Sequence, residues 1–275
     1  MHDNRVSVID SSWGNLLSSY TINTVRAYEQ LFKPGAAQGQ AFFFASGDAG
    51  DKSVRIGHVD HDYPASDPWV TSVGGTTLNI DADGHRVWEA GWGYDTWALR
   101  NGQWVNDGFG PTWQRPAYQQ GVVHSLTSGR AYPDIAADAD NLTGVRVGYV
   151  QHFPTGNQYA ETRWGGTSVA SPLMVGEQAA AQEALGGRVG FANPLIYALA
   201  RTGSNAFHDV TAAHDAAALV RPDFVNGYNG QNGVAHTIRT VDDDTSLRTA
   251  PGWDDVTGVG TPTANYPAAL AGAAR

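Results

Sequence analysis

The first part of the chain alternates between apolar runs and a helical pattern. Residues 5–10 form a short apolar run, residues 19–32 form a helical stretch, and residues 40–45 are continuously apolar. A continuous apolar run is typical of a strand buried on both faces. We expect the helix to end at Pro34-Gly35, because proline and glycine interrupt helices. Strand, helix and strand together predict a right-handed crossover between parallel strands.

The middle of the chain, residues 63–159, has the pattern of short strands separated by turns. Three strand-like stretches there are bounded by Gly, Asp-Gly and Asn-Gly: 69–80, 81–92 and 99–108. A helical pattern returns at residues 167–185, with Ala and Gly on every side, which indicates a helix packed closely in the interior. A further short helix is predicted at residues 193–200.

These elements predict an α/β fold with a mostly parallel sheet that helices cover. No Pro/Ser-rich or charged linker divides the chain, so we expect residues 1–275 to form one domain. Residues 220–249 are polar and turn-rich without clear periodicity. We interpret them as an excursion from the core that returns at residues 251–253.

Charge and cysteine content exclude several classes of protein. The 27 acidic and 17 basic side chains give a net charge of −10, which repels nucleic acid and anionic membranes. The absence of cysteine excludes disulfides, thiol catalysis and cysteine metal sites. No apolar run has the length of a membrane span, and the first residues do not form an export signal. We therefore expect a soluble chain with neither a nucleic-acid nor a membrane partner.

The strongest chemical signal is the octet GGTSVASP at residues 165–172. Glycines permit a tight turn, and the start of a helix places free N–H groups and partial positive charge beside Ser168. That arrangement suits a nucleophile and the oxyanion that its attack creates. The alternative is that Thr167 or Ser168 only caps the helix.

The octet contains GTSxAxP, which resembles the motif around the nucleophilic serine of subtilisins and sedolisins. The stretch SGDAG at residues 46–50 is similar to the sedolisin SGDxG, where subtilisins use an asparagine. A carboxyl group can stabilise an oxyanion only if it is protonated and donates a hydrogen bond. The resemblance therefore implies that Ser168 is the nucleophile, that Asp48 is the oxyanion donor, and that the chemistry occurs in acid. The alternative for Asp48 is a turn aspartate that accepts from local backbone N–H groups.

Further stretches agree with the sedolisin family in the same order along the chain. They are Ser12-Trp13-Gly14, YPASDP at 63–68, VGGTTL at 73–78, RPAYQ at 115–119, PDIAADA at 133–139 and NPLIY at 193–197. The resemblance implies a subtilisin-like three-layer fold and a serine endopeptidase that acts through an acyl-enzyme on peptides or proteins. It also implies secretion.

The resemblance implies one calcium ion as well. Its ligands would be two aspartates and three backbone carbonyls: Asp209, Asp254, Val210, Ala250 and Gly252. Calcium prefers several oxygen ligands from flexible loops. Ala250 departs from the family, which usually has glycine there. Without the resemblance, these aspartates are interpreted as ordinary turn residues.

One part of the family pattern has no counterpart. Sedolisins activate the serine with a glutamate, oriented by an aspartate, on a helix before the strand that ends in SxG. Here that strand begins within ten residues of Met1, so we expect the base and the N-terminal strands and helices to be missing. A further segment or chain would then complete the sheet. Glu29, Glu89 and Glu161 match no family base, and a serine without a base is a weak nucleophile.

Substrate preference is left open, because residues 106–112 replace the Gly-Gly-Gly stretch, followed by serine, that the family usually has. Two other functions compete with the peptidase. One is a catalytically silent, peptide-binding pseudoprotease, and the other is a calcium-dependent carbohydrate-binding module.

Weaker candidates have plainer interpretations. The loop at residues 58–62 suggests a metal site because it contains His58, Asp60, His61 and Asp62. A loop of this composition is more often a solvated surface. We interpret five tryptophans as packing residues rather than a sugar platform: Trp88, Trp92, Trp97, Trp104 and Trp113.

Overall fold

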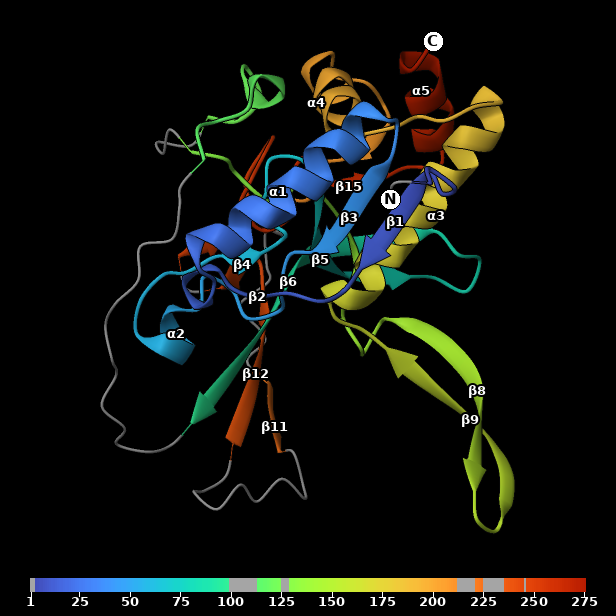
Figure 1. Ribbon diagram of the computed structural model, residues 1–275. Helices are drawn as coiled ribbons and strands as arrows, with labels where there is room; N and C mark the ends of the chain where they lie inside the picture. The colour runs from blue at the N-terminus through green and yellow to red at the C-terminus, as the bar shows by residue number, and fades with distance from the viewer. Residues whose placement is uncertain (1–2, 99–112, 125–128, 212–220, 225–234, 245) are drawn as a thin grey trace.

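The computed structural model describes residues 3–98, 113–124, 129–211, 221–224, 235–244 and 246–275. Figure 1 shows a central sheet between helices, with the two chain ends near the same end of the molecule. The predicted strand-like stretch at 99–108 lies almost entirely outside the described residues.

Four parallel strands form the centre of the sheet, in the order β1 (Val8–Ser11), β3 (Ala41–Ala45), β5 (Thr71–Ile80) and β7 (Ile135–Asp138). Strand β3 is apolar throughout because both of its faces are covered. Phe43 packs into the larger core cluster, whereas its neighbours Phe42 and Phe44 pack into another cluster on the opposite face. The prediction of a parallel sheet covered on both sides is confirmed.

Strand β5 continues beyond the parallel region into an antiparallel part of the sheet. It pairs with β6 (Arg86–Ala98), which pairs with β12 (Ala235–Val241), which pairs with β11 (Arg221–Phe224). The expected strand at 81–92 therefore starts later, because residues 81–85 form the turn between β5 and β6. Residues 220–249, which had no clear periodicity, contain two strands of this sheet.

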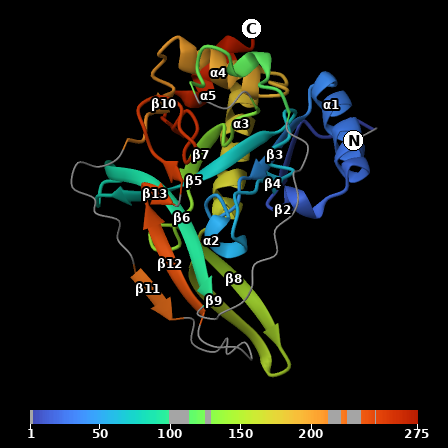
Figure 2. The same ribbon diagram turned by 90° about the vertical axis from the view of Figure 1, so that its left-hand side faces the viewer.

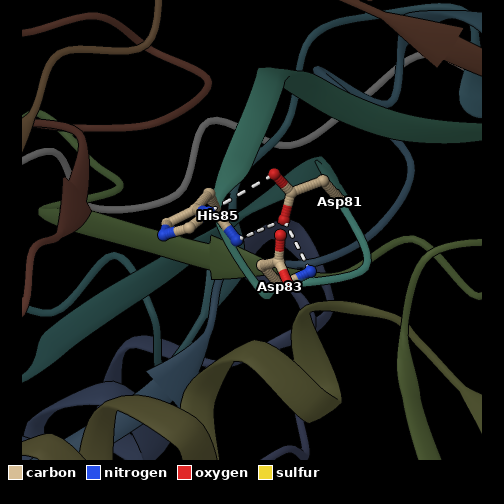
Figure 3. Close-up of side chains that lie close together, drawn as sticks. All are labelled: Asp81, Asp83 and His85. Carbon is tan, nitrogen blue, oxygen red and sulfur yellow. Dashed lines mark hydrogen bonds and ion pairs between the residues drawn. The ribbon is translucent and has the colours of Figure 1, made fainter.

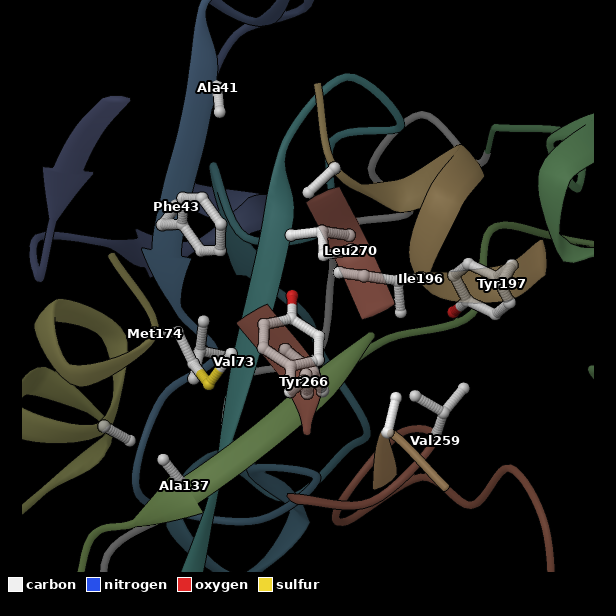
Figure 4. Packing of buried hydrophobic residues seen from close by; sticks show 14 of the residues in the cluster. Ala41, Phe43, Val73, Ala137, Met174, Ile196, Tyr197, Val259, Tyr266 and Leu270 are labelled. Carbon is white, nitrogen blue, oxygen red and sulfur yellow. The ribbon is translucent and has the colours of Figure 1, made fainter. Parts of the chain in front are cut away.

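Helices complete the three layers. Helix α1 (Ile22–Ala37) covers one face, while α3 (Thr167–Leu185), α4 (Asn193–Arg201) and α5 (Tyr266–Ala273) lie on the other (Figures 1 and 2). Helix α3 has the predicted bounds, and it contacts all four parallel strands. Around it, the larger cluster contains Met174, Ile196, Tyr266 and Leu270 (Figure 4).

The prediction that α1 ends at Pro34-Gly35 is wrong. Pro34 lies inside the helix, where it removes one backbone donor, and the helix continues to Ala37. Gly35 lies so close to the ring of Phe42 that a Cβ atom there would overlap it, so the last turn is held against β3. The chain leaves the helix at Gly39, whose φ is 76°.

The remaining elements are short, apart from one long hairpin. The hairpin consists of β8 (Val145–Phe153) and β9 (Gly156–Trp164), and it projects from the body (Figure 1). The short elements are β2 (Asn15–Leu16), η1 (Leu17–Ser19), α2 (Ser53–Ile56), β4 (Asp62–Tyr63), η2 (Ala117–Gln119), β10 (Phe207–His208), β13 (Asp243–Asp244), β14 (Leu247–Arg248) and β15 (Thr261–Pro262). Within the described residues, no helix combines the length and the apolarity that crossing a membrane requires.

A buried polar cluster around Asp134 joins these layers. Two nitrogens of the Arg130 guanidinium donate to the two carboxylate oxygens of Asp134, at 2.8 and 2.6 Å, and both side chains are almost completely buried. The same carboxylate accepts from Ser72 N in β5 at 2.8 Å. It also accepts from two side chains of α4, Tyr197 at 2.9 Å and Asn193 at 3.2 Å. One charge therefore ties β5 and α4 to the segment that enters β7.

We expect Asp134→Asn to lower the free energy of unfolding by about 3–5 kcal/mol, because it leaves the charge of Arg130 buried without its partner. Denaturant unfolding followed by tryptophan fluorescence measures the change. The double variant Arg130→Met/Asp134→Leu should lose less stability than the two single variants added together. Asp83→Asn, at an exposed turn, is the control and should change stability by no more than about 0.5 kcal/mol. Full stability of Asp134→Asn would contradict this account.

Candidate active site

The turn before α3 is built by two glycines with different roles. A Cβ atom on Gly165 would overlap the backbone of residues 139–141, so only glycine permits this close approach. Gly166 has a φ of 87°, a conformation that favours glycine, and its N–H donates to Ala139 O at 2.5 Å. The turn delivers Ser168 to the first turn of α3, where its side chain is exposed while Thr167 beside it is buried.

Asp48 lies against the same turn, although 119 residues separate it from Thr167. Its Oδ1 accepts from both Thr167 N and Thr167 Oγ1, each at 2.8 Å. Gly47, with a φ of 97°, turns the chain at the end of β3, and its N–H donates to Thr167 Oγ1 at 3.2 Å. The two motifs therefore lie together, and the hydrogen bonds of Asp48 are with Thr167, the neighbour of Ser168.

Strand β1 and the turn that follows it hold α3 from a third direction. Ser12 Oγ donates to the carbonyl oxygen of Ser168 at 2.9 Å, and Ser171 Oγ donates to Asp10 Oδ1 at 2.5 Å. Burial raises the pKa of Asp10, and the hydrogen bond from Ser171 partly offsets that rise. The SxG motif pointed to Ser12, but no sequence signal singled out Asp10, since its partner lies 161 residues away.

A cleft of about 210 Å³ opens beside Asp48. Its wall includes Asp60, His61, Tyr132 and Asp255, so the cleft is rich in carboxyl groups. Peptide segments from the end of β3 and from the loop before β7 meet at this cleft. Ser168 itself is not among the residues that line it.

The interpretation of residues 58–62 as solvated surface is wrong for two of the aspartates. Asp60 is 7% exposed and accepts from Ser18 Oγ at 2.5 Å. Asp62 pairs with the buried Lys52 at 2.6 Å, directly behind the Gly47 turn. Local charge pairing and hydrogen bonding, rather than solvent, satisfy these carboxylates.

The metal-ligating groups of that loop do not converge into a cluster. Among the described residues, one set of three such side chains converges, the exposed Asp81, Asp83 and His85 in the β5–β6 turn (Figure 3). Asp81 Oδ1 accepts from the N–H groups of Asp83 and His85, at 3.0 and 2.8 Å. Those hydrogen bonds lower the pKa of Asp81, and the one from His85 N contributes most. The cluster is explained as the cap of a hairpin turn.

The two loops of the expected calcium site lie together. Asp209 Oδ2 accepts from Gly252 N at 2.8 Å, and Asp254 Oδ2 accepts from Ala250 N at 3.2 Å. Asp254 is 4% exposed, and burial raises its pKa to about 7. Val210 beside Asp209 is fully buried. Both aspartates therefore accept from backbone N–H groups of the loop that follows residue 249.

The three glutamates considered as substitutes for the base have partners elsewhere. Glu29 accepts from Trp113 Nε1 at 2.5 Å. Glu89 is buried and accepts hydrogen bonds from the hydroxyls of Thr76 and Thr261. Glu161 forms an ion pair with Arg146 on the projecting hairpin. Their contacts connect none of them with the first turn of α3.

Of the five tryptophans interpreted as packing residues, the structure describes the side chains of Trp88, Trp92 and Trp113. Trp92 is 7% exposed, and Trp113 stacks on Tyr63 with ring centroids 5.8 Å apart. Trp88 is 37% exposed and belongs to β6. Trp104, the side chain of Trp97 and residues 106–112 lie outside the described part of the chain.

The comparisons with known proteins agree with this geometry. Residues 1–198 match the subtilase family. The chain is 31% identical over 267 residues to kumamolisin from Bacillus sp. (strain MN-32), covering 95% of this chain and 42% of that protein. It is 31% identical over 272 residues to sedolisin from Pseudomonas sp. (strain 101), covering 94% and 40%. Human tripeptidyl-peptidase 1 is 31% identical over 278 residues, covering 92% and 40%.

Among solved structures, Pseudomonas sedolisin, a serine-carboxyl proteinase complexed with pseudo-iodotyrostatin, superposes with a TM-score of 0.70 at 29% identity. That match covers 98% of this chain and 66% of the other. The chain thus spans about two fifths of the length of the curated relatives it matches. The match to the subtilase family over residues 1–198, with these relatives and this fold, shows that the chain belongs to the subtilase family, in its sedolisin branch of serine-carboxyl peptidases.

Proposed function

We propose that this chain carries the nucleophile and the oxyanion donor of an acid-active serine endopeptidase that cleaves polypeptides. The observation that carries the proposal is the contact of Asp48 with Thr167, which brings a carboxyl group to the helix start that presents Ser168. Ser168 Oγ would attack the peptide carbonyl carbon and form an acyl-enzyme, with release of the amine and later hydrolysis by water.

The two oxygens of Asp48 have different roles in this mechanism. Oδ1 is held by both donors of Thr167, which fixes the orientation of the carboxyl group. Oδ2 would carry the proton and donate it as a hydrogen bond to the oxyanion, together with the N–H groups at the start of α3. An ionised Asp48 would repel the oxyanion, so turnover requires the acid form.

The proton of Ser168 also needs an acceptor. We propose that a glutamate and aspartate pair from a segment outside these 275 residues supplies it. Support comes from the contacts of Glu29, Glu89 and Glu161, all away from α3, and from the greater length of the relatives. Among the described strands β1 ends the sheet, so its outer edge can accept the strand of such a segment.

We expect the isolated chain to hydrolyse peptides negligibly at any pH, because Glu29, Glu89 and Glu161 are bonded elsewhere and the proposed base lies on another segment. Adding the segment that carries the base, fused or as a separate chain, should produce turnover that is greatest in acid. Ser168→Ala should abolish this turnover, whereas Ser171→Ala on the same helix should retain a measurable part of it. Steady-state cleavage of a fluorogenic peptide measures both.

Two outcomes would contradict this account. Robust Ser168-dependent cleavage by the isolated chain would mean that another group acts as base. Failure of an active-site acylating reagent to label Ser168 in the complemented protein would favour the silent pseudoprotease. Sugar-dependent quenching of tryptophan fluorescence, unaffected by Ser168→Ala, would favour the carbohydrate-binding module instead.

Buried carboxyl groups support an acidic working environment. Burial raises the pKa of Asp67 to about 7 and that of Asp138 to about 6, and Asp67 has no exposed surface. Both values lie above the ordinary value of 3.8, so between about pH 4 and 7 the folded chain binds more protons than the unfolded chain. These groups therefore make the folded state most stable in acid, and that contribution is lost as the pH rises.

We expect Asp67→Asn to flatten the decrease in unfolding free energy between pH 4 and 7. The amide keeps an oxygen for Trp69 N, which donates to Asp67 Oδ1 at 2.9 Å, but it has no proton to lose. Each pKa unit corresponds to about 1.4 kcal/mol, so the full contribution of Asp67 is at most about 4 kcal/mol. Denaturant titrations at each pH measure it, with the exposed Asp83→Asn as control. An unchanged slope in Asp67→Asn would refute the assignment.

We also propose one calcium ion at Asp209, Asp254 and the backbone carbonyls of Val210, Ala250 and Gly252, in a protein that is secreted like its family. The donors fit such an ion, since they are all oxygens and come from loops that already touch. Among the described Lys and Arg side chains, none forms an ion pair with the buried Asp254, and a bound cation would compensate its charge. The ion would compete with Gly252 N for Asp209. At Asp254 it would compete with three backbone donors, Ala250 N, Val256 N and Thr257 N, and with the hydroxyl of Thr257.

We expect calcium to raise the melting temperature and chelation to lower it. Free calcium at a hundredfold excess over its dissociation constant stabilises the folded state by about 2.7 kcal/mol. Asp254→Asn should remove the calcium-dependent shift, and Asp83→Asn in the exposed turn cluster should keep it. An identical melting curve with and without chelator, in protein shown beforehand to contain the metal, would count against the site.

A further inference from the structure

The projecting hairpin, which we call the β8–β9 ribbon, consists of residues 145–164. Its strands pair in register from Val145 with Trp164 to Phe153 with Gly156. Along both strands all residues are exposed except Tyr149 and Ala160, which face each other and are half-buried. Figures 1 and 2 show that the ribbon extends away from the helices and the central sheet. Among the described strands, neither pairs with a third one.

The two faces of the ribbon differ in character, because side chains alternate along each strand. One face, which we call the apolar face, carries Val145, Val147, Tyr149, Phe153, Ala160, Thr162 and Trp164, with two glutamines. The opposite face, the polar face, carries Arg146, Gly148, Val150, His152, Asn157, Tyr159, Glu161 and Arg163.

Polar side chains on the polar face form hydrogen bonds and an ion pair with one another. Glu161 forms an ion pair with Arg146 and accepts from Tyr159 OH at 2.7 Å. The ring of Tyr159 lies across Gly148, where a Cβ atom would overlap it. His152 contacts Asn157 at 2.6 Å. This face needs no partner beyond water.

The apolar face, in contrast, exposes large hydrophobic side chains. Val145 and Val147 are each 37% exposed, Phe153 is 43% exposed and Trp164 is 52% exposed. A two-stranded ribbon is at best marginally stable in water unless a third strand or a packed surface covers its apolar side. An exposed apolar patch of this kind is typical of a binding surface.

We propose that the apolar face of the β8–β9 ribbon binds an extended apolar stretch of the polypeptide substrate, away from the bond that is cleaved. Continuity with the active site supports this occupant. Trp164, at the base of the apolar face, is four residues before Ser168, and only the Gly165-Gly166-Thr167 turn lies between them. A polypeptide that places a peptide bond at Ser168 can therefore continue onto the ribbon.

Charge disfavours a second copy of the chain as the occupant. Each molecule carries a net charge of −10, so two copies of the chain repel each other. The ribbon itself has two arginines and one glutamate, so it presents a small positive surface on an acidic protein. An unfolded apolar segment with few basic residues suits this surface. The inference rests on the proposed peptidase function, because that function supplies the polypeptide.

The test uses the full chain with Ser168→Ala, so that the probe stays intact. The probe is fluorescein-labelled, oxidised insulin B chain, and fluorescence anisotropy gives the dissociation constant. Two matched changes separate the faces: Val147→Thr on the apolar face and Val150→Thr on the polar face, where Val150 is 52% exposed. We expect Val147→Thr to weaken binding about threefold, and Val147→Thr/Phe153→Ser about tenfold. Val150→Thr should leave it unchanged.

Thermal melting shows whether each variant is folded, and the complemented protein, labelled at Ser168, tests the peptidase proposal separately. Labelled Ser168 together with equal affinities for all variants would overturn the ribbon proposal while the peptidase proposal stands. No binding of the probe by the folded Ser168→Ala chain would also overturn the ribbon proposal. Light scattering gives a further contradicting outcome. If Val147→Thr/Phe153→Ser changed the protein from dimer to monomer and left the peptide affinity unchanged, the occupant of the apolar face would be a second copy of the chain.

Discussion

Asp134 is a buried carboxylate, and hydrogen bonds to it position segments that are distant in the sequence. Its carboxylate holds β5 through Ser72 and α4 through Tyr197, while its backbone carbonyl accepts from Val259 N at 3.0 Å. Gly258 packs so closely on the backbone of Asp134 that no side chain would fit. The C-terminal loop with the proposed calcium ligands is thus docked on the same residue that aligns β5 and β7. The loop therefore contacts the backbone of the residue whose carboxylate holds β5 and α4.

Close packing between the sheet and the glycine turn also positions Ser168, the proposed nucleophile. A Cβ atom on Gly75 in β5 would overlap Ala139 and Trp92 and press on Thr167. Ala139 in turn accepts from Gly166 N, and Thr167 holds Asp48. Small residues at these positions let the sheet, the glycine turn and the SGD turn touch directly. The position of Ser168 is therefore fixed by packing between backbones, which allows little adjustment.

The sequence predicted the elements that depend on neighbouring residues and the contacts between segments that carry a specific family motif. The bounds of α3 follow from its glycine start and its Ala-rich pattern, and the meeting of Asp48 with the α3 turn follows from two family motifs. The extension of α1 through Pro34 was missed because it depends on Gly35 packing against Phe42 in the next strand. Asp10 and the strands β11 and β12 were missed because their partners are distant in sequence.

Asp10 helps to hold the start of α3 against β1. It lies on the strand beside the helix, and its carboxylate accepts from Ser171, one turn beyond Ser168. Asp10 Oδ1 is thereby engaged in holding the helix. In the proposed mechanism Asp48, the other carboxyl group bonded to this turn, keeps a proton and donates it as a hydrogen bond to the oxyanion. The proposed mechanism therefore uses Asp48 as a donor and Asp10 as a support of α3, and it assigns the proton of Ser168 to a third carboxyl group.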